Sequence, residues 1–180
     1  ADIFFKRAGK IRVSSGEATA CIQYKTTVGE YAVHVYGTLL DGSLKLLGTT
    51  EYTVSSPQLS VRADNYDQTA GTFDVFVENI SSASGVDRVQ IPVWSASDQS
   101  NIVWYDGQRQ ADGSYKATVN IADHAYGTGT YKVHVYLTAG NGVTGFTSTS
   151  QEVKLPEMKI SADNLDGKEM EYSLKIMNAG

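Results

Sequence analysis

Apolar and polar residues alternate with a period of two in several segments of this chain. In residues 115–121, one face carries Tyr115, Ala117, Val119 and Ile121, and the other carries Lys116, Thr118 and Asn120. Residues 73–78 and 88–93 alternate in the same way. Successive side chains of a strand point to opposite faces, so each pattern predicts an antiparallel strand with one buried face.

Turn dipeptides that accept positive φ separate these segments. Asp-Gly or Asn-Gly occurs at 41–42, 106–107, 112–113, 141–142 and 166–167. The sequence contains eleven Tyr and no long run of helical periodicity. Short strands at intervals of about ten residues predict an all-β fold of immunoglobulin-like antiparallel sandwiches.

The chain repeats itself with a period close to one sandwich domain. The segment 29–36, GEYAVHVY, returns 100 residues later as 129–136, GTYKVHVY. The segment 57–65, PQLSVRADN, returns 99 residues later as 156–164, PEMKISADN. A period of this length indicates tandem modules rather than a solenoid.

The repeat divides the chain into three parts. We expect the C-terminal half of one copy in 1–55, a complete copy in 56–155 and the first two strands of another in 156–180. Half a sandwich exposes its inner face, so either residues 156–180 complete residues 1–55, within a molecule or between neighbours, or the sequence is part of a longer chain.

Charge and cysteine content exclude several classes of protein. The net charge of −5 gives no electrostatic footprint for nucleic acid, and no apolar stretch is long enough to span a bilayer. One Cys, Cys21, forms neither an internal disulfide nor a multi-thiolate zinc site, and alternation around it predicts a small packed residue rather than a nucleophile.

A series of motifs in the complete copy resembles a known repeat. In order, these are IPVW at 91–94, WY at 104–105, DGSY at 112–115, DH at 123–124 and GTYKVHVY at 129–136. The series resembles the group B streptococcal Bsp-like repeat of Gram-positive, chiefly streptococcal, surface proteins and peptidoglycan hydrolases. The resemblance covers nearly all of 57–154. Residues 1–28 depart from it, with Phe4-Phe5 standing roughly where Trp104-Tyr105 would be.

The resemblance implies an extracellular, wall-associated and non-catalytic module, attached to an enzyme or adhesin elsewhere in the polypeptide. The residues themselves show no GxSxG, no catalytic Cys-His signature and no HExxH or clustered His ligands, so we expect no enzyme activity, no cofactor and no zinc. Asp123 and His124 are adjacent, and neighbours on a strand point oppositely, so we expect a turn rather than an acid–base dyad.

Aromatic residues are the better candidates for binding, because exposed rings stack on the CH faces of sugars. Either Trp104 or Tyr105 faces the core, and a sandwich favours Trp104 as its core tryptophan, which leaves Trp94 and Tyr105 as the exposed pair. His134 and Tyr136 are repeated as His34 and Tyr36, and each pair lies on the outer face of its strand. The pair forms either a binding patch or part of the packed structure. The candidate glycan-binding residues are Trp94, Trp104, Tyr105, Tyr126, His134, Tyr136, His34 and Tyr36.

Two other features have structural interpretations. Tyr31 and Tyr131 fit the tyrosine corner, which ties a loop to the sheet through its hydroxyl. Asp64, Asn65 and Asp67 recur at the start of the next copy, either as a calcium site that stiffens the junction or as Asx turns.

Three functions are open at this point. The module targets or positions its parent protein on peptidoglycan or its attached polymers, it contacts a host surface protein through strand edges or aromatic patches, or it is a spacer without a ligand. The first is the leading hypothesis, with the parent protein at the cell wall or cell surface.

Overall fold

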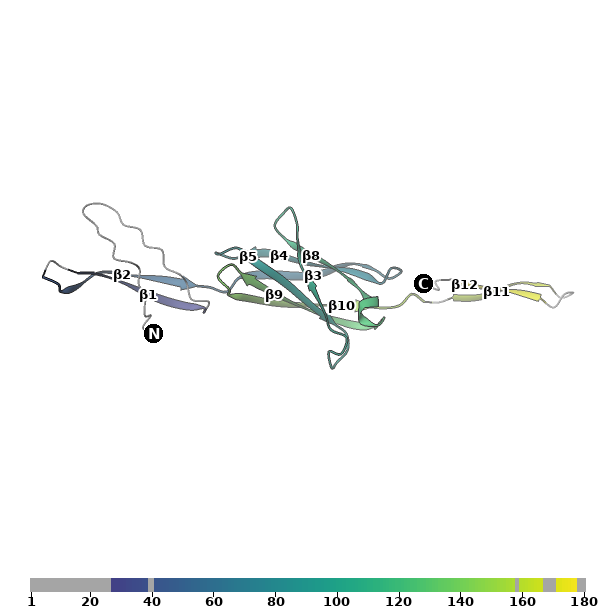
Figure 1. The fold of residues 1–180 in the computed structure, drawn as a ribbon. Coiled ribbons are helices and arrows are strands. Elements are labelled where there is room, and N and C mark those ends of the chain that lie inside the picture. The colour runs from purple at the N-terminus through teal and green to yellow at the C-terminus, as the bar shows by residue number, and fades with distance from the viewer. Residues whose placement is uncertain (1–26, 39–40, 158, 167–170, 178–180) are drawn as a thin grey trace.

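The computed structural model describes residues 27–38, 41–157, 159–166 and 171–177, whose regular secondary structure is nearly all strand (Figure 1). Cys21 and Phe4-Phe5, for which the sequence carries predictions, lie outside the described residues. The elements are β1 (Gly29–Thr38), β2 (Leu44–Val54), β3 (Gln58–Asp67), β4 (Thr72–Ser81), β5 (Val86–Trp94), β6 (Val103–Asp106), β7 (Gln108–Arg109), β8 (Tyr115–Asn120), the 3-10 helix η1 (Ile121–His124), β9 (Gly129–Ala139), β10 (Thr144–Val153), β11 (Lys159–Asp166) and β12 (Glu171–Met177).

Strands β3 to β10 form a two-layer sandwich. One sheet has the order β10-β9-β5-β6 and the other has the order β3-β4-β8-β7, and all neighbours are antiparallel. The predicted all-β sandwich is therefore confirmed.

The core lies between the two sheets and consists of the residues that the alternation assigned to one face. Phe73, Val75 and Val77 on β4 meet Val89, Ile91 and Val93 on β5, and all six side chains are buried. Burying one large apolar side chain stabilises the folded state by about 1.5–3 kcal/mol, so this layer is the main source of stability.

The chain changes sheets between β6 and β7. Asp106 pairs with Gln90 in one sheet, whereas Gln108 pairs with Lys116 in the other. Between them, the Gly107 N–H donates to the Val89 carbonyl, and a Cβ on Gly107 would come within 3.0 Å of the Val89 side chain. The close approach explains why glycine stands at this crossover.

Both predicted tyrosine corners are present. The Tyr131 hydroxyl donates to the Gly127 carbonyl at 2.8 Å, and the Tyr31 hydroxyl donates to the Thr27 carbonyl at 2.6 Å. Both bonds span four residues of sequence, so the repeat preserves the local geometry. Tyr131 is fully buried and packs edge-on against Phe73, whereas Tyr31 is partly exposed.

We expect Tyr131→Phe to lower the free energy of unfolding of the sandwich by about 1–2 kcal/mol, because the Gly127 carbonyl loses its buried donor. Tyr31→Phe is the matched control, and we expect it to change that free energy by less than about 0.5 kcal/mol. Urea unfolding followed by intrinsic fluorescence measures both. Equal effects of the two variants would contradict the assignment of a stabilising corner to the complete copy.

Two hairpins flank the sandwich, one beyond each end (Figure 1). Strands β1 and β2 pair with each other, and so do β11 and β12, each pair forming a separate two-stranded sheet. The two hairpins are separate sheets, and completion of residues 1–55 by residues 156–180, within a molecule or between neighbours, stays a prediction. Both hairpins expose large apolar side chains, among them Val35, Leu46, Leu47, Ile160, Leu174 and Ile176.

The linker that leaves the sandwich toward β11 is bonded to the end of β3 and to the turn that follows it. The Tyr66 hydroxyl donates to the Lys154 carbonyl at 2.5 Å and accepts from the Lys154 N–H at 2.9 Å. The Gln68 side-chain amide donates to the Leu155 carbonyl at 2.7 Å. Tyr66 and Gln68 thus fix the first two residues of the linker that follows the sandwich, Lys154 and Leu155.

Candidate glycan-binding face

An aromatic row crosses the outer face of the β10-β9-β5-β6 sheet. On β9, Val133 and Val135 point into the core, so His134 and Tyr136 point outward. Trp104 lies outward on β6 and Phe146 lies outward on β10, directly opposite Tyr136 in the antiparallel register. We call Trp104, Tyr136 and Phe146 the aromatic row.

The three rings of the aromatic row lie close enough to form one surface. Trp104 and Tyr136 are stacked, with ring centroids 6.1 Å apart and an interplanar angle of 21°. Tyr136 and Phe146 are tilted, with centroids 5.2 Å apart. Trp104 and Phe146 are each 54% exposed, which is unusual for residues of this size in a well-packed sheet.

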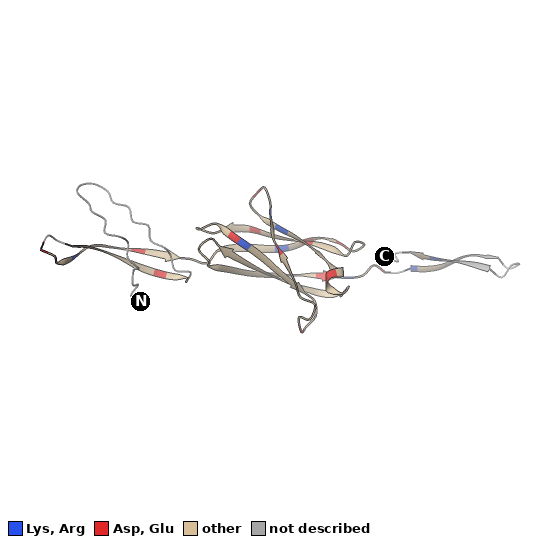
Figure 2. Ribbon diagram, viewed as in Figure 1, with Lys and Arg blue, Asp and Glu red and all other residues tan. Residues whose placement is uncertain are grey.

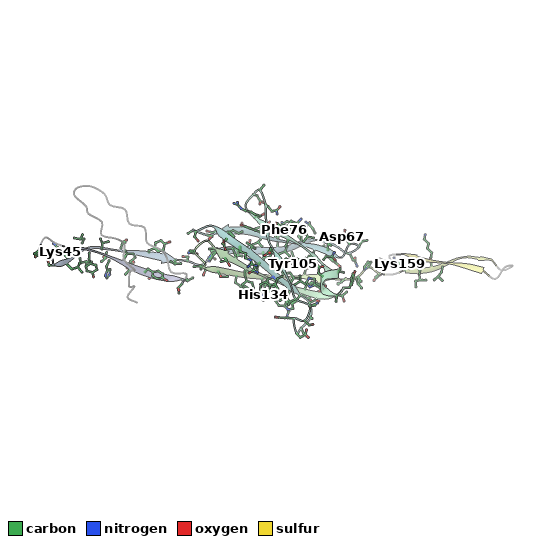
Figure 3. All side chains as sticks on the ribbon, viewed as in Figure 1. Lys45, Asp67, Phe76, Tyr105, His134 and Lys159 are labelled. Atoms are coloured by element: carbon green, nitrogen blue, oxygen red, sulfur yellow. The ribbon has the colours of Figure 1, made fainter. Side chains whose placement is uncertain are left out.

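His134 and Trp94 support the row from one side (His134 is labelled in Figure 3). The His134 ring meets the Phe146 ring edge-on at 5.1 Å and the Trp94 ring edge-on at 4.6 Å. Trp94 is only 4% exposed although it points away from the core. The expectation that Trp94 is exposed is therefore wrong, because the His134 ring on the neighbouring strand packs against it.

The assignment within the Trp104-Tyr105 pair is also corrected. Trp104 faces solvent, and Tyr105 turns inward, half-buried against the core. The Tyr105 hydroxyl donates to Asp123 Oδ2 at 3.1 Å and lies 2.9 Å from His124 Nε2. Tyrosine takes the inner position because the buried His124 needs a hydroxyl partner there, which a tryptophan does not supply.

The Asp123-His124 pair lies on η1 rather than on a strand, and this changes its geometry. The side chain of Asn120 caps η1 by accepting from the Ala122 N–H, and the tight turn brings both Asp123 and His124 to Tyr105. The expectation that their side chains diverge is wrong, whereas the expected turn is present. His124 Nδ1 lies 2.9 Å from the Asn101 carbonyl and donates to it.

The hydrogen bonds of this cluster are structural. Burial raises the pKa of the Tyr105 phenol, and the nearby Asp123 carboxylate raises it further. The hydroxyl is therefore protonated at neutral pH and does not act as a nucleophile. His124 is 1% exposed, so its ring is closed to solvent.

The other aromatic candidates lie away from the row. Tyr126 is 67% exposed on the loop after η1, and no ring contact joins it to the row among the described side chains. His34 and Tyr36 lie exposed on β1 with ring centroids 6.3 Å apart, and His134 and Tyr136 are separated by 6.4 Å. Leu46 stands opposite Tyr36 where Phe146 stands opposite Tyr136.

Phe146 is the member of the row that sequence reasoning missed. The signal was present, because the Asn141-Gly142 turn sets the register of the β9–β10 hairpin. A hairpin that turns at these residues places Phe146 across from Tyr136, on the same outward face.

The acidic residues near the junction are engaged with protein groups. Asp67, labelled in Figure 3, accepts from the Thr69 and Ala70 N–H groups in an Asx turn. Asp64 pairs with Arg62 at 2.7 Å, and the Asn65 amide donates to Asp74. Within the described ranges, no three His, Cys, Asp or Glu side chains are grouped to hold a metal ion. The Asx turn accounts for Asp67 without calcium.

Comparison with known proteins identifies the module. The family model for the GBS Bsp-like repeat matches residues 62–152, half of the chain. This chain belongs to the Bsp-like repeat family. Bsp-like repeats occur in surface proteins, and membership supports a non-catalytic repeat module. No helix in the described part of this Bsp-like chain is long and apolar enough to cross a membrane.

Solved structures similar to this Bsp-like chain include two long proteins. One is described as a tetra-tandem repeat in the extending region of a large adhesion protein, with a TM-score of 0.47, 20% identity, and coverage of 82% of this chain and 38% of that one. The other is a polysaccharide deacetylase from Bacillus cereus, with a TM-score of 0.46 and 10% identity. The match covers 62% of this chain and 36% of that one. This chain therefore spans less than two fifths of the length of either. No curated protein matches the sequence.

Proposed function

We propose that this module binds the glycan of a Gram-positive cell wall through the aromatic row and so positions its parent surface protein or peptidoglycan hydrolase. The observation that carries the proposal is the row of aromatic rings on one sheet face, in which exposed Trp104 and Phe146 flank the half-buried Tyr136. Successive ring centroids lie 6.1 and 5.2 Å apart, so the row extends across the sheet from β10 to β6, and we expect its exposed parts to contact more than one sugar.

Polar groups beside the row suit the hydroxyl and amide groups of a sugar. Gln90 lies next to Tyr136 in the ladder, and the outward Arg88 and Asp106 form an exposed ion pair at 3.5 Å. Aromatic faces supply most of the binding energy in such sites, and a few polar groups fix orientation. The face is rigid, because every residue of the row lies on a paired strand.

Charge does not favour a strongly anionic polymer as the main ligand. Basic and acidic residues are interspersed over the sandwich (Figure 2), and the net charge of the chain is negative. Binding through stacking should therefore depend weakly on salt, whereas binding through counterion release falls steeply as salt rises.

Sedimentation with purified walls tests the proposal. We expect the full chain to pellet with intact walls and with walls stripped of their attached polymers, and to be displaced by soluble wall glycan. The same assay in 0.1 and 0.5 M NaCl should give similar bound fractions. Saturable binding to immobilised host matrix protein without binding to walls would select the adhesin function instead, and no binding to either would leave a spacer.

A further inference from the structure

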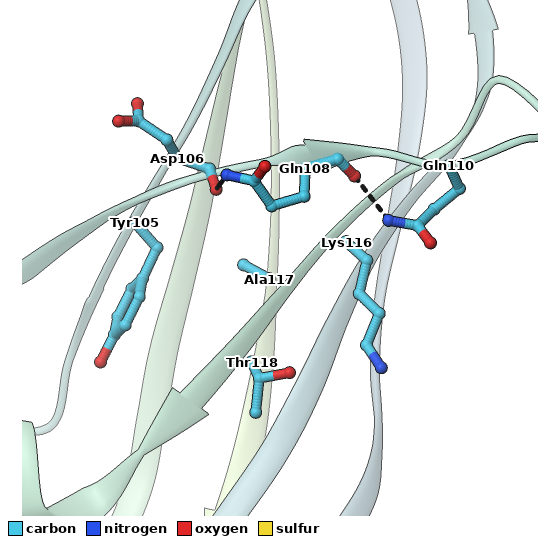
Figure 4. Close-up of a pocket in the computed structure, with 7 residues that line it drawn as sticks. All are labelled: Tyr105, Asp106, Gln108, Gln110, Lys116, Ala117 and Thr118. Atoms are coloured by element: carbon cyan, nitrogen blue, oxygen red, sulfur yellow. Dashed lines mark hydrogen bonds between the residues drawn. The ribbon is translucent and has the colours of Figure 1, made fainter.

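A groove lies on the other side of β6 from the aromatic row, beside β8, where the chain passes from β6 to β7 (Figure 4). It has a volume of about 410 Å³ and is lined by Tyr105, Asp106, Gln108, Gln110, Lys116, Ala117 and Thr118. This volume is within the range of about 300–1,000 Å³ that small-ligand sites occupy. Because Trp104 and Tyr105 are consecutive on one strand, the row and the groove are adjacent.

The groove is bordered by a strand edge that has lost its partner. The Gln110 N–H donates to the Ser114 carbonyl, and two residues further along the ladder Gln108 pairs with Lys116. Continued in the same register, the next pair would join residue 106 to Thr118. Asp106 instead pairs with Gln90 in the other sheet.

The consequence is a main-chain site at Thr118. Backbone groups of an antiparallel strand alternate in direction, so the N–H and carbonyl of Thr118 point to the same side as those of Lys116, into the groove. No described strand pairs with β8 on that side at Thr118. The Thr118 hydroxyl is occupied separately, because it donates to Asp74 on the outer face.

The groove is close to neutral and rich in amides. The Lys116 ammonium lies 2.9 Å from the Asp74 carboxylate. Burial acts to raise the pKa of Asp74, but hydrogen bonds from Asn65, Thr118 and Lys116 outweigh it, so the pKa is lowered and the ion pair persists. The side-chain amides of Gln108 and Gln110 donate to backbone carbonyls.

We propose that this groove binds the peptide branch of the wall polymer in an extended conformation, by strand addition to β8 at Thr118. The proposal rests on the proposed glycan function, since it assigns the sugar and the peptide of one polymer to the two sides of β6. A peptide in this position supplies a carbonyl and an N–H to the main chain of Thr118, which residue 106 does not. The side-chain amides of Gln108 and Gln110 form hydrogen bonds with further carbonyls and N–H groups of the peptide.

A saccharide suits the groove less well than a peptide. The Tyr105 ring is half-buried and its hydroxyl is already bonded to Asp123 and His124, so it offers a wall rather than an open stacking face. The open ring faces are on the opposite side of β6, at Trp104 and its neighbours.

Nuclear magnetic resonance titration of the full chain separates the two sites. The reporters are the Trp104 indole N–H for the row and the Thr118 backbone N–H for the groove. The probes are tri-N-acetylglucosamine, the free wall peptide, and a muropeptide that carries both. We expect the trisaccharide to shift Trp104, the peptide to shift Thr118 and slow its hydrogen exchange, and the muropeptide to do both.

Thr118→Pro removes the donor without removing a ladder bond, since proline is tolerated where the N–H faces away from a partner strand. With Thr118→Pro we expect at least a fivefold loss of peptide affinity, measured by isothermal titration, and an unchanged Trp104 response, which also reports a native fold. Thr118→Val is the matched control that loses the Asp74 bond and keeps the donor, and we expect it to bind the peptide.

The outcomes separate the two proposals. If the Thr118 N–H resonance does not shift with the peptide or the muropeptide while the Trp104 resonance shifts with the trisaccharide, the groove assignment is overturned and the glycan function stays in place. A Thr118 amide that responds to the trisaccharide would overturn it in favour of a sugar. If the Trp104 resonance does not shift with the trisaccharide while the Thr118 resonance shifts with the peptide, the glycan function alone is removed and the peptide site is supported.

Discussion

Trp104→Ala should reduce the affinity of the full chain for purified wall glycan by about tenfold or more. The variant removes the larger of the two exposed rings of the row. A tenfold loss corresponds to about 1.4 kcal/mol, a modest amount for truncating a tryptophan at a binding site. Binding isotherms from sedimentation give the dissociation constants directly. Because Trp104 is half-exposed, we expect the melting temperature to change little.

Tyr126→Ala is the matched control for this experiment. Tyr126 is exposed but lies outside the row, so its removal should leave the affinity unchanged. Comparable losses from the two variants would show that general surface aromaticity, and not the row, carries binding. A Trp104→Ala variant that binds like the parent would remove the row from the proposal.

His124→Ala should be among the most destabilising single substitutions in the sandwich. The ring is buried, donates to the Asn101 carbonyl, lies 2.9 Å from the Tyr105 hydroxyl and packs edge-on against Tyr131 at 5.2 Å. Its loss leaves a cavity and removes the donor to the Asn101 carbonyl, whereas the Tyr105 hydroxyl keeps Asp123 as a partner. We expect about 3–4 kcal/mol of lost stability, combining the cavity with the unpaired carbonyl.

Asp123→Ala tests the same cluster without opening the core. Asp123 is exposed and the Tyr105 hydroxyl keeps His124 as a partner, so we expect a loss below about 1 kcal/mol. Guanidinium unfolding monitored by circular dichroism measures both variants. If His124→Ala stayed within about 1 kcal/mol of the parent, the cluster would have no structural role of the kind described.

The sequence predicted the strands well because their alternation carries the burial pattern directly. Val75, Val77, Ala117 and Val119 are buried as expected, and Tyr131 ties its loop as a corner tyrosine. In these positions one face of the strand is fixed by the core, so residue type and orientation agree.

The candidate site was harder to predict where neighbouring residues are both aromatic. Alternation states that Trp104 and Tyr105 face opposite ways but not which one faces in. That choice depends on His124, which reaches Tyr105 through a 3-10 turn that no strand periodicity describes. Trp94 shows the converse, since a residue on the outer face is buried by a ring from the next strand.

The clamp that Tyr66 and Gln68 place on Lys154 and Leu155 has a mechanical consequence for tandem copies. Because the exit segment is bonded at both main-chain groups of Lys154, a bend at this junction must first break these bonds. In the next copy the corresponding positions are Leu165 and Gly167, which offer no hydroxyl or amide for the same purpose. A junction with Tyr and Gln at these positions is therefore stiffer than one with Leu and Gly.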